Sequence, residues 1–128
     1  MNCKNSLFSK MQNVLGMGTD IKDICDTLKR GYSPLAVSGL SSVHKSQLAM
    51  LVEEYVCENT APLLIIADDE AGAKRICDDI NEMQGETAAY VFPAKDITLA
   101  RVESISREYE YQRLCVLSRI TDKSCRFV

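Results

Sequence analysis

The chain has 128 residues, of which 46% are hydrophobic and 26% are charged, and its formal net charge is −3. This composition is typical of a single folded domain with a modest core, and it excludes a disordered chain. The net negative charge gives no electrostatic case for nucleic-acid binding. No apolar run approaches the roughly 18–20 residues of a membrane span, and the polar N-terminus is unlike a secretory signal.

Metal-binding residue types are sparse. His44 is the only histidine, and no C-x-x-C occurs among the six cysteines. A zinc site therefore has little support, and we expect no metal. Four cysteines fall in helical patterns, which predicts small core or boundary side chains, and free thiols are typical of a reducing cytoplasm. The cysteines are Cys3, Cys25, Cys57, Cys77, Cys115 and Cys125.

Two short helices are predicted at the start of the chain. The first is an apolar stripe that is broken by Gly16 and Gly18. The second is capped by Thr19 or Asp20 and ends at Gly31. The apolar positions of the two stripes are Leu7, Met11, Val14 and Leu15, and then Ile21, Ile24, Cys25 and Leu28.

Strands and helices are then predicted to alternate. Residues 35–39 form a short buried strand, and residues 45–59 form an amphipathic helix. The continuous apolar run 63–67 is typical of a strand covered on both faces, and the helix after it ends at Gly85. The apolar positions of these helices are Leu48, Leu51, Val52, Tyr55 and Val56, and then Ala73, Ile76, Cys77, Ile80 and Met83.

The remaining elements complete the alternation. Residues 88–92 are a third strand, residues 103–120 are the longest helix, and residues 125–128 begin a further strand. This order predicts a three-layer α/β fold, with a parallel sheet, right-handed crossovers and flanking helices. Residues 1–31 would be a helical lead-in, and residues 32–128 would form this subdomain. Because the chain stops inside an apolar strand pattern, we expect a longer parent protein.

The segment before the first long helix nearly spells a phosphate-binding loop. Gly39 is followed, after four residues, by His44, Lys45 and Ser46, so only the second glycine of G-x-x-x-x-G-K-[ST] is missing. In a working loop, backbone N–H groups cradle the phosphates, the lysine reaches the outer phosphates and the hydroxyl holds Mg²⁺. His44 adds a ring where the phosphate approaches the backbone. The sequence therefore predicts a degenerate, non-functional loop without a cofactor.

An acidic cluster follows the predicted strand 63–67. Asp68, Asp69 and Glu70 after an apolar run resemble the Asp-Glu pair that holds Mg²⁺ in ATPases. The strand that precedes this cluster, however, comes directly after the helix that follows the loop, whereas the acidic motif of helicase-type motors comes later. Its position favours helix capping and complementation of the helix dipole.

Three blocks of the sequence resemble the N-terminal segment of the bacterial transcription-repair coupling factors. They read GLSSVHKSQLA, PLLIIADDEAGAKRICDDI and VFPAKDITLARVESISREYEYQRLCVL, and the likeness spans residues 34–117. The last block is the most specific. Its Phe-Pro-Ala-Lys-Asp at 92–96 and Arg-Glu-Tyr-Glu at 107–110 are similar to a Phe-Pro-Ala-Arg-Asp stretch and an Arg-Glu-Tyr-Glu helix in that family.

The resemblance implies a role in DNA repair. Members of that family are multidomain DNA translocases that displace stalled RNA polymerase and recruit nucleotide excision repair. Their first subdomain is helicase-like and similar to excinuclease B, with a degenerate phosphate loop and no ATPase of its own. The implied partners are other domains of the parent chain, and the parent binds RNA polymerase, the excinuclease A subunit and DNA. His44 fits the degenerate loop, but Lys45 and Ser46 keep the residue types of a working one.

The resemblance thus implies a non-catalytic module that scaffolds the inserted adaptor domain, with ATP and Mg²⁺ confined to the parent's motor domains. Two other classes stay open, namely a stand-alone P-loop enzyme or nucleotide sensor, and a small interaction module. His44 and the missing later acidic motif argue against the enzyme. For the loop itself, a working ATP site and a plain turn capped by Ser41 or Ser42 also remain open.

Overall fold

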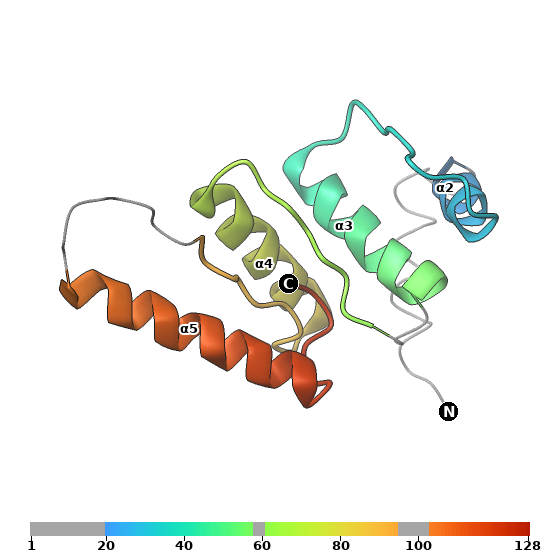
Figure 1. Ribbon diagram of the computed structural model, residues 1–128. Coiled ribbons are helices and arrows are strands. Elements are labelled where there is room, and N and C mark those ends of the chain that lie inside the picture. The colour runs from blue at the N-terminus through green and yellow to red at the C-terminus, as the bar shows by residue number, and fades with distance from the viewer. Residues whose placement is uncertain (1–19, 58–60, 95–102) are drawn as a thin grey trace. The chain divides into compact units, whose positions relative to one another are not determined.

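The computed structural model describes residues 20–57, 61–94 and 103–128. The chain divides into two compact units, Met1–Ser38 and Gly39–Val128. The predicted stripe over residues 7–15 lies outside the described residues. No helix in the described ranges is long and apolar enough to cross a membrane. The helices are α2 (Asp20–Lys29), α3 (Ser42–Val52), the π-helix η1 (Glu53–Cys57), α4 (Glu70–Gln84) and α5 (Glu103–Thr121) (Figure 1).

Helix α2 is the described helix of the first unit. It buries Cys25 on its apolar side, and it ends as predicted at Gly31, whose φ of +83° is a left-handed conformation that glycine adopts without strain. The following residues are irregular, and the side chains of Leu35 and Val37 are exposed. The predicted strand over residues 35–39 is therefore wrong.

Helix α3 opens the second unit and starts earlier than its apolar pattern indicates. The side chain of Ser41 accepts a hydrogen bond from the backbone N–H of His44, which is the usual action of an N-cap serine. Met50 and Leu51 are buried on the inner face of the helix. After Val52 the backbone continues as η1, so the described part of the predicted helix exists, but it is π-helical rather than α-helical over Glu53–Cys57.

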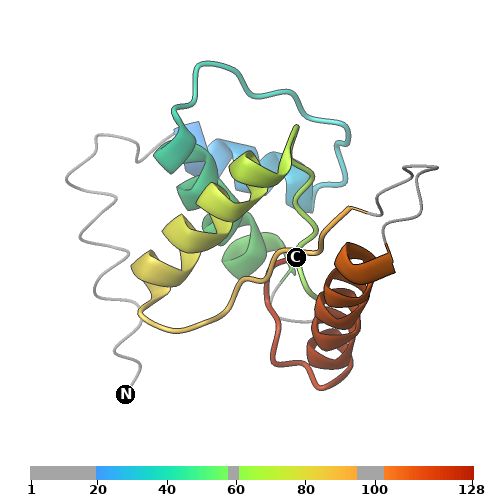
Figure 2. The same cartoon turned by 90° about the vertical axis from the view of Figure 1, so that its left-hand side faces the viewer.

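Helix α4 agrees with the prediction at both ends. Asp69 caps its start, and Gly85, with a φ of +68°, caps its end. Ile80 is fully buried on the face that the apolar spacing marks as inward. Helix α4 packs beside α3, as both views of the molecule show (Figure 1, Figure 2).

Helix α5 is also close to its predicted bounds and is held to the segment after α4 by two arginines. The guanidinium of Arg113 lies 4.5 Å from the ring centre of Phe92, and that of Arg119 lies 4.6 Å from the ring centre of Tyr90. After α5 the chain turns back, and its last residues run beside the segments that precede and follow α4 (Figure 2).

The predicted three-layer parallel sheet is wrong. Segments 63–65, 126–128 and 88–90 lie side by side in that order, and we call them the extended trio. They meet only through two isolated parallel bridges, Leu63–Phe127 and Ala89–Phe127, and the described ranges contain no strand. Short apolar runs favour extended backbone, but a ladder needs successive paired residues on both sides. Here each outer segment shares only a single bridge with the central one. The second unit is thus built mainly from helices, which overturns the P-loop, helicase-like fold class.

Candidate functional site

The loop before α3 is closed by its own side chains. Gly39 is exposed, with a φ of +81°. The Oγ of Ser41 accepts from the backbone N–H of His44 at 3.4 Å and lies 3.0 Å from Nδ1 of the same residue. The imidazole therefore folds back onto the helix cap. The Lys45 side chain is exposed, while its backbone N–H bonds the carbonyl of Ser41 at 3.0 Å.

Ser46 faces away from the loop. It is fully buried, and its hydroxyl donates to Oδ2 of Asp79 on α4 at 3.2 Å, with the carbonyl oxygen of Ser42 at 3.4 Å as a second acceptor. The carboxylate beside this hydroxyl disfavours a phosphate at the same place, because like charges repel. The structure thus separates Lys45, at the surface, from Ser46, in the contact between α3 and α4.

The acidic cluster begins α4. The Oδ1 of Asp69 accepts from the backbone N–H of Gly72 at 2.6 Å, so the capping interpretation is confirmed for this residue. Asp68 and Glu70 are exposed on either side of it. In the part of the chain that the structure describes, no group of three or more histidine, cysteine or acidic side chains is arranged to hold a metal ion.

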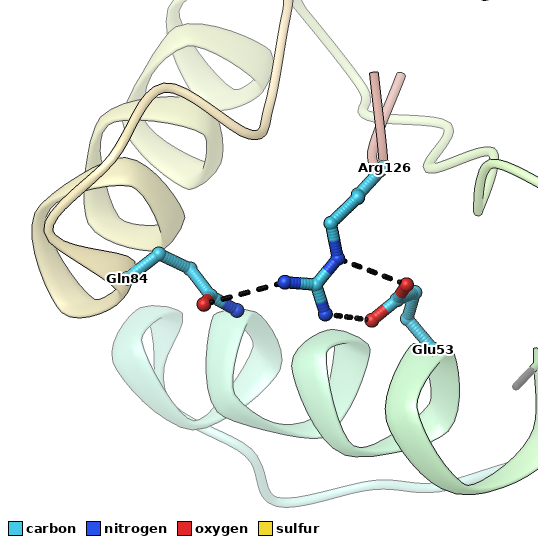
Figure 3. A network of polar contacts seen from close by, with 3 residues as sticks. All are labelled: Glu53, Gln84 and Arg126. Carbon is cyan, nitrogen blue, oxygen red and sulfur yellow. Dashed lines mark hydrogen bonds and ion pairs between the residues drawn. The ribbon is translucent and has the colours of Figure 1, made fainter. Parts of the chain in front are cut away.

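A buried ion pair joins three elements of the second unit (Figure 3). Glu53 of η1 has a side chain that is only 1% exposed, and both of its oxygens accept from the guanidinium of Arg126. The Nε–Oε1 distance is 3.0 Å, and Nη1 reaches Oε1 of Gln84 on α4 at 3.5 Å. We call these residues the Glu53–Arg126–Gln84 network.

This network fixes the central segment of the extended trio. The hydrogen bonds to Glu53 raise the pKa of Arg126 further above its ordinary high value, against the opposing effect of burial. A fully buried carboxylate needs a charged partner, since an unpaired one costs several kcal/mol. The network therefore has a structural role, because both of its charges are already satisfied within the chain.

Asn81 of α4 closes one outer edge of the extended trio. Its Oδ1 accepts from the backbone N–H groups of Ala88 and Ala89, both at 2.8 Å, and its Nδ2 donates to the carbonyl of Ala89 at 3.0 Å. The thiol of Cys77 donates to the same carbonyl at 3.2 Å, and burial raises the pKa of Cys77. We call segment 88–90 the closed edge.

An apolar cavity of about 370 Å³ lies between α4, the extended trio and Arg113 of α5. Its size falls within the range of small-ligand sites. The walls are mainly aliphatic and aromatic, and acidic residues from the start of α4 lie at one end. Prominent among the lining residues are Leu64, Ile66, Ile76, Phe92 and Phe127. Residues on three different elements thus leave a hollow that their own side chains do not fill.

Sequence reasoning missed Asp79, Asn81, Glu53 and Arg126. Glu53 and Arg126 are 73 positions apart, and no local pattern links residues at that separation. One signal was available, because Ser46, Met50 and Glu53 recur at the spacing of a single helical face. A glutamate on a buried stripe requires a cation elsewhere in the chain. The spacing does not say which cation.

Comparison with known proteins gives one similarity of note. The chain is 22% identical, over 112 residues, to the transcription-repair-coupling factor of Bacillus subtilis (strain 168). The alignment covers 88% of this chain and 9% of that protein, so the chain spans less than a tenth of its relative's length. No protein-family model matches the chain, and no solved structure matches it.

Proposed function

We propose that this chain is a non-catalytic module of a protein that couples transcription to DNA repair, and that it serves as a scaffold for other domains. The likeness to the coupling factor along 88% of the chain supports this role. Translocation and the binding of RNA polymerase, excinuclease A and DNA would belong to the remainder of such a protein, since the chain matches 9% of its relative.

The observation that carries the non-catalytic assignment is the hydrogen bond between Ser46 and Asp79. A phosphate loop needs its hydroxyl free for Mg²⁺ and its lysine aimed at the same phosphates. Here the hydroxyl is buried against a carboxylate, and the imidazole of His44 is bonded to Ser41. Lys45 alone is exposed, and a single surface lysine does not make a nucleotide site.

Exposed apolar side chains support the scaffold role. Tyr111, Leu114 and Leu117 on α5 are 69%, 64% and 48% exposed, and Leu64 and Ile66 beside the apolar cavity are also exposed. Because Tyr111, Leu114 and Leu117 recur at three-residue spacing, they lie along one side of α5, as on a helix surface that packs against other protein. A module that scaffolds neighbouring domains needs such surfaces, whereas a stand-alone enzyme does not.

Strand-specific repair in the source organism tests the proposal. After ultraviolet irradiation, removal of photoproducts is measured on the transcribed and the non-transcribed strand of an induced gene. Deletion of the sequence encoding residues 39–128, or Arg126→Ala, should abolish the faster repair of the transcribed strand. Lys45→Ala, made in protein of unchanged abundance, should preserve it.

Two results would contradict the proposal. If the deletion leaves the strand difference intact, the chain has no part in coupling. If Lys45→Ala alone removes the difference at normal protein levels, the lysine has a catalytic or nucleotide-binding role, and the P-loop enzyme becomes the better interpretation.

A further inference from the structure

One outer edge of the extended trio has backbone groups that find no partner among the described residues. Leu63 and Ile65 are bonded to the central segment. The N–H of Leu63 donates to the carbonyl of Arg126 at 2.8 Å, and its carbonyl accepts from the N–H of Val128 at 3.0 Å. The N–H of Ile65 donates to the carbonyl of Val128 at 2.7 Å. Because successive residues of extended backbone point their polar groups to alternate sides, those of Leu64 and Ile66 point outward. We call residues 64–66 the open edge.

The open edge is accessible. The side chains of Leu64 and Ile66 are 68% and 88% exposed. Within the described ranges, neither residue has a hydrogen-bond partner for its backbone N–H or C=O. An exposed row of this kind is a template for pairing with another extended chain. The closed edge offers no such template, because Asn81 already occupies its outward groups.

The residues around the open edge indicate what kind of ligand would fit it. Leu64 and Ile66 also line the apolar cavity, so side chains that extend this face of the trio meet an apolar hollow. At the end of the edge, Asp68 and Glu70 are exposed, and neither has an ion-pair partner among the described residues. Asp69 is excluded from this role because it caps α4.

We propose that the open edge binds an extended segment of a partner polypeptide, with apolar residues at alternate positions and a lysine or arginine beside Asp68 and Glu70. Backbone hydrogen bonds to residues 64 and 66 would supply affinity, and the cavity and the two carboxylates would supply selectivity. The inference goes beyond the proposed function, since it needs only the geometry of this edge.

Synthetic peptides test the proposal directly on the full chain. Two fluorescent hexapeptides of alternating valine and threonine carry two added lysines, one peptide at its N-terminus and the other at its C-terminus. One of them should bind saturably by fluorescence anisotropy, and the one that binds reports whether pairing is antiparallel or parallel. The same peptides with glutamates in place of lysines should bind about tenfold more weakly.

Two variants connect binding to the edge. Ile66→Pro removes an outward N–H and leaves the inward bonds of Leu63 and Ile65, so it should weaken peptide binding at least about tenfold. Tyr55→Ala, a change of an exposed aromatic side chain on η1 outside the lining of the cavity, is the matched control and should leave binding unchanged. If Ile66→Pro fails to fold, the charge reversal Asp68→Lys with Glu70→Lys still decides, because the preference should switch to the glutamate peptides.

Three outcomes would overturn the proposal. Neither lysine peptide saturates up to 1 mM, or binding persists unaltered in both edge variants, or the protein dimerises in sedimentation and Ile66→Pro restores the monomer. The last result would assign the edge to a second copy of the chain. Failure of peptide binding leaves strand-specific repair untouched, so the two proposals fail separately.

Discussion

The two outer edges of the extended trio are completed in opposite ways. At the closed edge, one side chain of α4 takes the place of a neighbouring strand, since Asn81 bonds both N–H groups and one carbonyl of Ala88 and Ala89. At the open edge, Leu64 and Ile66 have no such partner in the described structure. Among the described residues, the chain therefore satisfies one edge internally and leaves the other without hydrogen-bond partners.

A similar contrast separates the side chains of the loop motif, which have hydrogen-bond partners, from the backbone groups of the open edge, which have none among the described residues. Ser46 and His44, which belong to the degenerate phosphate loop that the sequence predicts, are engaged by Asp79 and Ser41. At the open edge, the groups without a partner among the described residues are backbone atoms, which no side-chain motif marks. The binding that we propose therefore depends on backbone groups and not on the loop motif.

The largest expected effect comes from removing the arginine that fixes the central segment of the extended trio. Arg126→Ala leaves Glu53 charged and buried, and it should lower the free energy of unfolding by about 3 kcal/mol. Urea denaturation followed by circular dichroism measures this. Because the lost partner is the cause, Glu53→Leu with Arg126→Met should recover most of the loss, and a double variant as unstable as Arg126→Ala would refute the assignment.

Opening the closed edge should have the next largest effect. Asn81→Ala leaves the N–H groups of Ala88 and Ala89 without a partner and removes one of the two donors to the Ala89 carbonyl, so it should cost about 2–3 kcal/mol in urea denaturation. Asn81→Asp keeps the oxygen that accepts both N–H groups and loses only the Nδ2 donor, so it should cost less. The exposed neighbour Glu82→Ala serves as control, and an equal loss from Glu82→Ala would show that Asn81 has no special part in the edge.

A smaller, pH-dependent effect is expected from the thiols near the closed edge. Burial raises the pKa of Cys77 and of Cys125 in the folded state. A raised thiol pKa means that the folded chain holds protons that the unfolded chain releases first. The stabilisation is therefore complete below the unfolded thiol value of about 8.5, and it declines as pH rises toward the folded value. Urea titrations between pH 8 and 10 measure the free energy of unfolding, which should decline less steeply with pH when Cys77→Ala and Cys125→Ala are combined. Identical slopes for the wild type and the double variant would contradict this.

The smallest effect is expected at the loop that resembles a nucleotide site. Wild-type protein should bind MgATP no more tightly than about 1 mM, by calorimetry. His44→Gly alone should give little gain, because the Ser46 hydroxyl stays bonded to Asp79. Micromolar binding by the wild type, lost on Lys45→Ala, would show that the loop is functional.

The helices could be predicted because their signals are local. Asp69 and Gly85 bound α4 through contacts within one turn, and the apolar spacing identified its inner face correctly. The sheet could not be predicted, because an apolar run fixes extended backbone but not the length of its partners. The predicted strand 63–67 is reduced to one bridge at Leu63, with Ile65 bonded to the central segment beside it.

In the candidate site, too, contacts between residues close in the sequence were predictable and contacts between distant residues were not. The Ser41–His44 contact spans three positions, and sequence reasoning had identified both residues. Ser46 and Asp79 are 33 positions apart, so the loop motif gave no hint that its hydroxyl is engaged on another helix. The open edge is defined by absent hydrogen bonds, which only the arrangement of distant segments can reveal.

Residue-resolved amide hydrogen exchange, followed by NMR, tests the asymmetry between the edges most directly. The amides of Ala88 and Ala89, bonded to Asn81, and those of Leu63 and Ile65 should exchange slowly, whereas Leu64 and Ile66 should exchange near their intrinsic rates. Addition of the lysine peptide that binds should slow exchange at Leu64 and Ile66 only. If these two amides are as protected as Ala89 in the free protein, the edge is already covered and the central claim is wrong.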